Sequence, residues 1–204
     1  MSSRGRLFVI SGPSGSGKTS LTNRLLEALP GLRFSVSYTT RPKRRGEEHG
    51  KQYFFVSSEE FEDMVDRNEF LEHAHVYGNH YGTSREFVES QLEEGLDVLL
   101  DIDVQGALIV RQATAEAVMI FVLPPSYAAL RERLIRRGLD DAQVIELRLQ
   151  LARKEIQYYR RYDYLVINDD LDRSLHELKS IVVAGRCAVG RRTVQAESIV
   201  STFE

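Results

Sequence analysis

One stretch near the amino terminus restricts the fold of this chain more than any other. Residues 12–19 read Gly-Pro-Ser-Gly-Ser-Gly-Lys-Thr, a match to the pattern G-x-x-x-x-G-K-[ST]. The apolar run at residues 7–10 precedes this loop, and four leucines follow it at helical spacing between Leu21 and Leu29. The sequence therefore predicts a buried strand, a glycine-rich loop and a helix in succession, which is the context in which such a loop binds phosphate groups.

The loop has the residue types that phosphate binding requires. Glycines let successive backbone N–H groups and the helix amino terminus point at a polyphosphate, Lys18 adds a positive charge, and Thr19 offers a hydroxyl to Mg²⁺. The alternative is a turn that only connects a strand to a helix, but it does not explain why every signature position and both flanks fit. We predict that ATP binds, with Mg²⁺, at Gly12, Pro13, Ser14, Gly15, Ser16, Gly17, Lys18, Thr19 and Ser20.

Length and charge limit the other possibilities. With 204 residues, the chain is long enough for one α/β domain with inserts and too short for two ordinary domains. The formal net charge is -3, so we expect no nucleic-acid partner, although local arginine clusters can still bind small phosphorylated molecules. The sequence leaves open whether the protein is a monomer or a homo-oligomer.

Cysteine use and hydropathy point to the cytoplasm. Cys187 is the only cysteine, so an internal disulfide is impossible, and its place in an apolar helical pattern predicts a buried thiol. The amino terminus lacks the apolar segment of a secretory signal, and no run approaches the roughly eighteen apolar residues of a membrane span. We therefore expect no membrane partner. The five histidines lack the spacing of a metal site.

Strand-like and helix-like patterns alternate along the chain, which indicates an α/β fold with a mainly parallel sheet covered by helices on both faces. Two segments interrupt this alternation: a small mixed insert after the first helix and an arginine-rich helical lid. The predicted division is core at 1–33, insert at 34–94, core at 95–124, lid at 125–162, core at 163–189 and a tail at 190–204, where periodicity fades and which we expect to be mobile or partner-dependent.

Several local signals give element boundaries. Ser57 and Glu60 form a capping-box pattern, and Ser84, Ser126 and Asp140 are predicted to begin helices. Residues 98–103 resemble a buried strand that ends in two carboxylates, Asp101 and Asp103. In open α/β sheets this end of a strand faces the ligand crevice, so both aspartates are candidate site residues.

A basic loop in the insert is a candidate clamp for a second phosphate. Arg41 and Arg44 are three residues apart on a loop with Glu47, and the phenols of Tyr53 and Tyr81 follow. Guanidinium groups bind phosphate through two parallel hydrogen bonds, and phenols add neutral donors. The alternative is a solvated basic loop, which is how many short charge runs behave.

Three further side chains of the insert suggest which base is carried by the molecule that accepts the phosphoryl group. The edge of guanine offers two donors, N1–H and the amine, beside the acceptor O6, and Glu72, Ser37 and Thr83 are a complementary set. Adenine has a lone pair at N1, which would leave a buried carboxylate opposite an acceptor, and such mismatches are strongly rejected. Guanine is favoured if the three side chains converge, which spacing alone does not establish.

These motifs occur together, in order, in one known family. From residue 8 to about residue 187 the chain resembles the guanylate kinases, which transfer a phosphoryl group from ATP to GMP. The resemblance is carried by residues 11–19, 34–37, 39–41, 46–47, 69–72, 81–83, 100–103, 105–106, 124–126, 137–138 and 168–170. Lys43 and Arg45 depart from the usual pattern by making the clamp loop more basic.

The resemblance implies a role for each matched position. Ser37, Glu72 and Thr83 would contact guanine, and the GMP phosphate would be held by Arg41, Arg44, Tyr53 and Tyr81. Asp101 and Asp103 would lie near the acceptor and the metal, with Asn168 near the adenine. Arg137 and Arg148 would belong to the lid. The group expected to act on the transferring phosphoryl is Lys18, Arg44, Arg137, Arg148 and Asp101.

The chemistry of phosphoryl transfer fits this assignment. The transition state is loose and its charge spreads over peripheral oxygens, so alignment and charge neutralisation matter more than covalent catalysis. The monophosphate is mostly ionised at neutral pH, so no general base is needed, and Asp101 is expected to organise metal-bound water or Arg41. Five arginines of the lid segment are Arg133, Arg136, Arg137, Arg148 and Arg153; most of them are expected to form an exposed helical face, because only one or two can reach the transferring group.

Three other functions are alternatives to a guanylate kinase activity, and a feature of the sequence argues against each of them. A non-catalytic module that uses the acceptor pocket for peptides would not need the intact phosphate loop. A GTPase switch would need an N-K-x-D motif, which is absent from the sequence. A kinase of another phosphorylated small molecule would not need Glu72.

Overall fold

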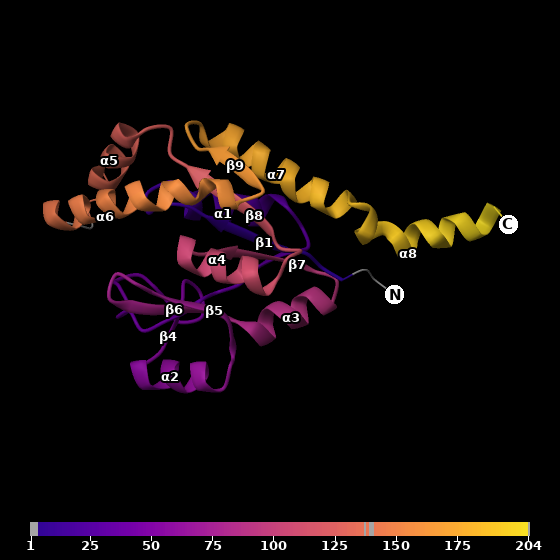
Figure 1. The fold of residues 1–204 in the computed structure, drawn as a ribbon, viewed down its shortest axis with the longest axis horizontal. Helices are drawn as coiled ribbons and strands as arrows, with labels where there is room; N and C mark the ends of the chain where they lie inside the picture. The colour runs from indigo at the N-terminus through magenta and orange to yellow at the C-terminus, as the bar shows by residue number, and fades with distance from the viewer. Residues whose placement is uncertain (1–3, 137, 139–140, 204) are drawn as a thin grey trace.

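The computed structural model describes residues 4–136, 138 and 141–203, and its elements form two sheets with helices around them (Figure 1). The larger sheet is entirely parallel and has the strand order β2-β7-β1-β8-β9. Its strands are β1 (Leu7–Ser11), β2 (Leu32–Phe34), β7 (Asp97–Asp101), β8 (Val118–Leu123) and β9 (Tyr164–Ile167). β1 is buried along its whole length, as expected for an apolar run in a parallel sheet covered on both faces.

The register of the central strands places three carboxyl ends at one edge of the sheet. Ile10 of β1 pairs with Asp101 of β7 on one side and with Ile120 of β8 on the other. The phosphate loop therefore leaves the sheet beside Asp101. This is the edge at which open α/β sheets bind ligands.

Helices cover both faces of the sheet, as predicted. One buried cluster packs α1 (Lys18–Ala28) and α7 (Leu171–Cys187) against the face that includes Phe8 and Ile10. The other packs α3 (Arg85–Glu93) and α4 (Val104–Ala113) against the face that includes Leu7 and Val9. The helix α4 was not predicted from the sequence, because its ten residues combine few polar positions with an internal glycine and give a weak helical pattern.

The insert forms a second sheet with the order β4-β3-β6-β5, which lies below the parallel sheet in Figure 1. Its strands are β3 (Tyr38–Thr39), β4 (Phe54–Phe55), β5 (Phe70–Val76) and β6 (Asn79–Ser84). The helix α2 (Ser58–Asp66) begins with the predicted capping box, since Ser57 Oγ accepts from the Glu60 N–H and Glu60 accepts in return from the Ser57 N–H. Ser84 caps α3, which also confirms its prediction.

The segment predicted as a lid contains α5 (Tyr127–Arg136), α6 (Ala142–Glu155) and the 3₁₀ helix η1 (Ile156–Arg161). Leu130 and Leu134 of α5 pack against Leu149 and Ala152 of α6 in a small separate core. Asp141 caps α6 by accepting from the Val144 N–H. The predicted cap, Asp140, lies outside the described residues, as does Arg137.

The carboxyl-terminal segment is helical. The chain forms α8 (Val189–Val200) and a short 3₁₀ helix, η2 (Ser201–Phe203), which extend away from the sheet (Figure 1). The apolar residues of α8 are largely exposed, so they give no strong amphipathic pattern in the sequence; Val189, for example, is 84% exposed.

Cys187 at the end of α7 is exposed, so the prediction of a buried thiol is wrong. No helix in residues 4–136, 138 and 141–203 is both long and apolar enough to cross a bilayer.

One buried carboxylate ties the end of the chain to the sheet. Asp97, the first residue of β7, is 2% exposed and accepts from the Arg6 N–H at 2.8 Å and from Arg186 Nε at 2.7 Å. Its other ion pair, at 3.3 Å, is with Arg191 of α8. Asp97 thus joins the start of β1 to α7 and α8.

Replacing Asp97 by asparagine should lower the free energy of unfolding by about 3 kcal/mol, because two arginines and a backbone N–H would lose a buried anionic acceptor. Urea unfolding followed by circular dichroism measures this change. Asp172→Asn is the matched control: its carboxylate pairs with Arg24 but is 86% exposed, and we expect a loss of less than about 1 kcal/mol. Equal losses in the two variants would contradict the anchoring role of Asp97.

Candidate functional site

The phosphate loop has the geometry of an anion cradle. Gly17 has a φ of 96°, and a Cβ there would lie 2.2 Å from Nδ2 of Asn168, so only glycine fits. Gly17 is also the N-cap of α1, and no side chain in the described part of the chain caps this helix. The first-turn N–H groups of α1 are therefore free of side-chain acceptors at the end where a helix attracts negative charge.

Lys18 points back over the loop. Its ammonium donates to the carbonyl oxygens of Gly12 at 2.5 Å and Pro13 at 3.1 Å. Both acceptors belong to the cradle itself, so the positive charge stays beside the position of a bound phosphate.

A cavity of about 1150 Å³ opens at the carboxyl edge of the sheet and joins the loop to the insert and to the lid. Its lining includes most of the predicted site residues: Gly12, Ser14, Gly15, Gly17, Lys18, Thr19, Ser20, Ser37, Arg41, Arg44, Tyr53, Glu72, Tyr81, Asp101, Asp103, Arg148 and Asn168. Pro13, Ser16 and Thr83 are not part of this lining, but each is hydrogen-bonded to a residue that is: Pro13 to Lys18, Ser16 to Asn168 and Thr83 to Glu72. Residues more than 100 positions apart thus share one cavity, which brings the phosphate loop and the predicted phosphate clamp of the insert together.

Oxygen ligands suited to magnesium meet beside the loop. Thr19 Oγ1 donates to Asp101 Oδ2 at 3.3 Å, and hydroxyl and carboxylate oxygens are the hard donors that Mg²⁺ prefers. Among the described residues, no three His, Cys, Asp or Glu side chains lie together as a metal-binding cluster. Thr19 and Asp101 therefore fit a magnesium ion that would take its remaining ligands from phosphate oxygens and water. Burial raises the pKa of Asp101, an effect opposed by Lys18 and Thr19.

Asp103 has a different position from the one predicted. It is not the last residue of a strand; it caps α4, accepting from the Gly106 N–H at 2.8 Å. The strand ends at Asp101, because the chain turns into α4 immediately afterwards. Asp103 still lines the cavity, and burial raises its pKa despite the hydrogen bonds from the backbone.

The clamp loop is ordered by an internal ion pair. Arg41 Nη2 lies 2.7 Å from Oε1 of Glu47, and Oε2 of the same carboxylate accepts from the Arg44 N–H at 2.8 Å. The Arg41 guanidinium also lies over the Tyr53 ring, 5.3 Å from its centroid. The alternative of a solvated basic loop is therefore wrong for Arg41, whose side chain is only 10% exposed. Its carboxylate partner is Glu47, not Asp101.

The two phenols of the clamp lie together. The rings of Tyr53 and Tyr81 are 5.8 Å apart in an edge-on arrangement. Burial, with smaller contributions from Tyr81 and Asp101, raises the pKa of Tyr53 to about 12. The Tyr53 hydroxyl thus remains protonated at neutral pH and can donate a hydrogen bond to an anion.

Glu72 is the only predicted base-binding carboxylate, and its surroundings are tight. It is 4% exposed, and Oε1 accepts from Thr83 Oγ1 at 2.6 Å across the β5–β6 hairpin. A Cβ at position 106 would lie 2.4 Å from Oε2, so Gly106 of α4 makes room for the carboxylate, which sequence reasoning had not recognised. Burial raises the pKa of Glu72 to about 7 although the Thr83 hydroxyl opposes the shift. Ser37, the third predicted partner of the base, lines the same cavity.

The helices of the lid segment reach the phosphate loop through arginines. Arg148 Nη1 of α6 donates to Ser14 Oγ at 3.0 Å. Arg133 of α5 donates to the carbonyl oxygens of Ser16 at 3.3 Å and Asn168 at 2.7 Å. The prediction that arginines other than Arg137 and Arg148 mainly form an exposed face is therefore wrong for Arg133.

Asn168, like Arg133, supports the phosphate loop. Its side-chain amide donates to the Ser16 carbonyl at 2.7 Å, so it holds the loop from the end of β9. The expected position of Asn168 beside the adenine stays a prediction. Neither Arg133 nor Asn168 has a local sequence signal for these contacts, because their partner Ser16 is 117 and 152 residues away.

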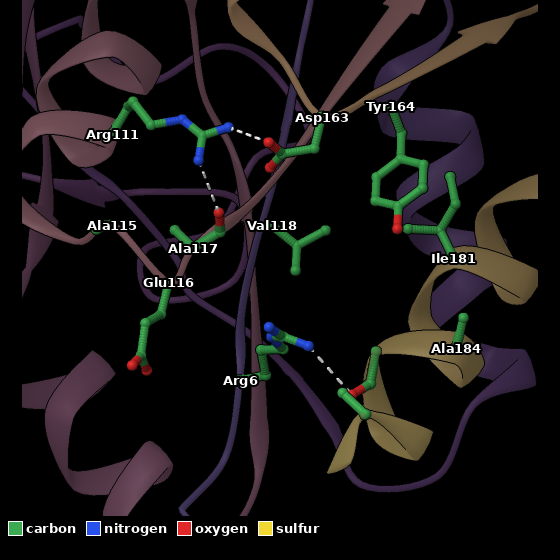
Figure 2. A pocket seen from close by; sticks show the side chains of 12 residues that line it. Arg6, Arg111, Ala115, Glu116, Ala117, Val118, Asp163, Tyr164, Ile181 and Ala184 are labelled. Carbon is green, nitrogen blue, oxygen red and sulfur yellow. Dashed lines mark hydrogen bonds and ion pairs between the residues drawn. The ribbon is translucent and has the colours of Figure 1, made fainter. Parts of the chain in front are cut away.

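A smaller hollow of about 350 Å³ lies at the opposite edge of the parallel sheet (Figure 2). It is formed where β8 and β9 begin and where α7 ends. Its two arginines are already engaged: Arg111 pairs with Asp163 at 2.5 Å, and Arg6 donates to the Gly185 carbonyl at 3.2 Å. This edge is remote from the strand ends that carry the phosphate loop, so the hollow is separate from the candidate site.

The fold and the cavity together define a class of protein. A phosphate loop on a parallel sheet shares one cavity with the arginines and tyrosines of the insert, which is the arrangement expected of a P-loop kinase that phosphorylates a small molecule.

Comparison with known proteins identifies the particular family. The family model for guanylate kinase matches residues 4–185. A guanylate kinase from Hahella chejuensis is 52% identical over 195 residues, covering 96% of this chain and 94% of the relative, and one from Escherichia coli K12 is 48% identical, covering 97% of each. The crystal structure of a guanylate kinase from Anaplasma phagocytophilum superposes with a TM-score of 0.79 at 36% identity, covering 93% of this chain and 90% of that one. The chain belongs to the guanylate kinase family.

Proposed function

We propose that this protein transfers the γ-phosphoryl group of ATP to GMP, giving ADP and GDP, and that the cavity at the carboxyl edge of the parallel sheet is where the transfer occurs. The observation that supports this most directly is the shared hollow: Lys18 and the phosphate loop line it on one side, and Glu72 and Arg41 line it on the other. ATP would place its triphosphate in the loop, and GMP would lie across the insert.

Each part of the acceptor site has a role in this proposal. Glu72 accepts the N1–H and amine protons of guanine, with Thr83 holding the carboxylate in place and Ser37 adding a hydroxyl. Arg41, Arg44, Tyr53 and Tyr81 bind the GMP phosphate. We extend the acceptor to dGMP, because none of the contacts that support the guanine assignment requires a 2′-hydroxyl.

The donor site is proposed to align the ATP phosphates and to neutralise their negative charge. Residues 12–20 wrap the phosphates of ATP, and Lys18 neutralises the transferring group together with Arg44, Arg148 and Arg137, the last of which lies outside the described residues. Thr19 would hold the magnesium ion, with Asp101 orienting its water ligands. The ion, when bound, neutralises charge on the phosphate oxygens. The second pKa of a monophosphate is near 6, so the attacking oxygen is mostly ionised at neutral pH and no side chain needs to remove a proton.

We further propose that α5 and α6 close over ATP and exclude water. Water in the site would otherwise compete with GMP for the phosphoryl group. We place the reaction in the cytoplasm, in keeping with a chain whose single cysteine cannot form an internal disulfide.

An ADP-release assay with ATP, Mg²⁺ and each of GMP, AMP, CMP and UMP tests the proposal. We expect turnover with GMP to exceed that with the other three by at least about 100-fold, because a buried carboxylate opposite the wrong hydrogen-bonding edge is heavily penalised. Equal use of AMP would show a P-loop kinase with another substrate. Absence of ATP consumption with all four nucleotides would favour a non-catalytic module.

A further inference from the structure

Tyr77 lines the cavity, but the proposed reaction gives it no role. It lies at the tip of the β5–β6 hairpin, where Val76 pairs with Asn79 and leaves Tyr77 and Gly78 as a two-residue turn. Both turn residues have a positive φ, 51° and 79°, as a type I′ turn requires. Such a turn favours asparagine or aspartate before the glycine, and a tyrosine in the left-handed region is strained. The turn itself therefore does not explain why a tyrosine is present.

The Tyr77 ring contacts the lid segment. The guanidinium of Arg148, on α6, lies over this ring with its Cζ 5.4 Å from the ring centroid, which is within the range of a cation–π interaction. The same guanidinium donates to Ser14 Oγ of the phosphate loop at 3.0 Å. Arg148 thus lies between an aromatic ring of the insert and a hydroxyl of the loop.

An aromatic ring is a suitable partner for an arginine that must bind phosphate. Its face attracts the guanidinium charge without requiring any of the five N–H donors, so these donors remain for oxygen atoms. The ring is also neutral, so it does not repel a triphosphate as a carboxylate would. Tyr77 is 41% exposed, so its ring is not part of a packed core. The ring can therefore hold Arg148 and leave it able to act on ATP.

The hairpin that carries Tyr77 also carries the predicted guanine site. Its two strands are paired along their length, and Glu72 pairs with Thr83 within this ladder. Tyr77 follows Glu72 by five positions, so the ladder fixes the distance from the guanine site to the ring. Arg148, in contrast, belongs to α6, which packs in the separate core of the lid segment. The contact between Tyr77 and Arg148 therefore connects the insert to the lid.

We propose that Tyr77 is a positioning residue that acts through Arg148: its ring holds the guanidinium beside the phosphate loop and links the placement of this arginine to the insert that binds GMP. A displacement of the hairpin moves the ring and Glu72 together, because both belong to one ladder. Arg148 is then held in place when the insert lies against the lid. This inference rests on the proposed transfer from ATP to GMP.

The substitution Tyr77→Asn removes the ring and supplies the residue that the turn favours. We expect the rate of phosphoryl transfer, measured in single turnovers, to fall about fivefold, which corresponds to a partly exposed cation–π interaction. The midpoint of thermal unfolding should stay the same or rise, because Asn-Gly suits a type I′ turn. A purely structural role of Tyr77 predicts lower activity together with lower stability. Tyr77→Phe keeps the ring face and should transfer phosphate within about twofold of the wild-type rate.

Tyr127→Leu is the matched control. Tyr127 of α5 is 42% exposed, and the guanidinium of Arg153 on α6 lies over its ring at 4.7 Å. Neither of these two residues lines the cavity. The control thus removes a similar interaction from the lid segment without touching Arg148, and the transfer rate should remain within about twofold of wild type.

Two further measurements test whether the ring acts through Arg148. In an Arg148→Ala background, Tyr77→Asn should change the single-turnover rate by less than about twofold, because the group through which the ring acts is gone. The sequence contains no tryptophan, so Tyr77→Trp introduces a single fluorophore and keeps an aromatic face. Adding Arg148→Ala to this variant should increase the quenching of its emission by acrylamide, measured without nucleotide, because the guanidinium no longer covers the ring.

The possible results give distinct conclusions. A wild-type transfer rate in Tyr77→Asn, an equal loss in Tyr77→Phe or Tyr127→Leu, or a fivefold loss that persists without Arg148 would overturn the positioning role. Quenching that does not depend on Arg148 would overturn the contact itself. If the wild-type protein releases no ADP with GMP while the quenching does depend on Arg148, the contact stands and the proposed function fails instead.

Discussion

Replacing Glu72 by glutamine should lower kcat/KM for GMP by about 100-fold, since one guanine donor would face an amide N–H inside a buried pocket. The dissociation constant for ATP should not change, because Glu72 lies in the insert and contacts Thr83 and not the phosphate loop. Steady-state assays with varied GMP measure the first quantity, and calorimetry with Mg·ATP measures the second.

The matched control is Glu69→Gln, one residue before β5, whose carboxylate is partly exposed and pairs with Arg67 at the surface. We expect its kcat/KM to stay within about twofold of wild type, as exposed ion pairs contribute little. Unchanged use of GMP by Glu72→Gln would refute the guanine assignment. A parallel loss of ATP binding would indicate a general folding defect instead.

The pKa of Glu72 adds a pH dependence to the same prediction. Guanine binding needs the ionised carboxylate, whose pKa in the empty site is about 7. GMP affinity should therefore weaken as the pH falls below 7, by about tenfold between pH 8 and pH 6. Protonation of the GMP phosphate also acts below pH 7, so the measurement is the difference between wild type and Glu72→Gln, which has no carboxylate to titrate at this position.

Folding stability should depend on Glu72 in the opposite direction. Because the folded-state pKa is raised above its ordinary value of 4.5, the folded protein holds the proton more tightly, and this contribution is full below pH 4.5 and is lost as the pH rises through 7. Without nucleotide, Glu72→Gln should thus gain stability relative to wild type by up to about 3 kcal/mol between pH 4.5 and pH 8. Denaturant titrations at several pH values measure this gain.

Arg148→Ala should lower kcat by about 1,000-fold with little change in GMP affinity, because an arginine that contacts the transferring phosphoryl group acts mainly in the transition state. Arg148 is the described lid arginine that reaches the loop at Ser14, and its guanidinium also lies 5.4 Å from the ring centroid of Tyr77 in the insert. It thus bridges the two sides of the cavity. Rapid-quench measurements of a single turnover separate the chemical step from product release.

Lys154→Ala is the control for Arg148. Lys154 lies on the same helix but is exposed and does not line the cavity, so kcat should remain within about twofold of wild type. A wild-type kcat in Arg148→Ala would dismiss the proposed action of α6 on the phosphoryl group. A rise in the GMP dissociation constant as large as the fall in kcat would assign Arg148 to acceptor binding.

Local patterns predicted the parts of this protein that depend on neighbouring residues. The strand, loop and helix around Lys18, the capping box at Ser57 and the helix start at Ser84 follow from spacings of a few residues, and the structure has all three. Family resemblance assigned Glu72 and Thr83 to one site, and the hairpin of β5 and β6 brings them within 2.6 Å.

Contacts between distant residues were not predictable in this way. Arg133 and Asn168 brace the loop from other elements, and Gly106 makes room for Glu72 from a helix that the sequence pattern did not reveal. The ion pair between Arg191 of α8 and Asp97 was not predictable for a related reason, because nothing near residue 191 indicates a partner so far away in the chain. The periodicity of a helix records which face is buried, so it is weak where a helix is mostly exposed.

The exposed thiol at the end of α7 makes the protein well suited to fluorescence distance measurements. Cys187 is the only cysteine, so a maleimide dye attaches at one position without removal of other thiols. It lies where α7 meets α8, away from α5 and the start of α6 (Figure 1). A second cysteine at Leu147, which is 50% exposed on α6, would complete a donor–acceptor pair. Energy transfer between the dyes would follow the displacement of α6 in solution as nucleotides are added.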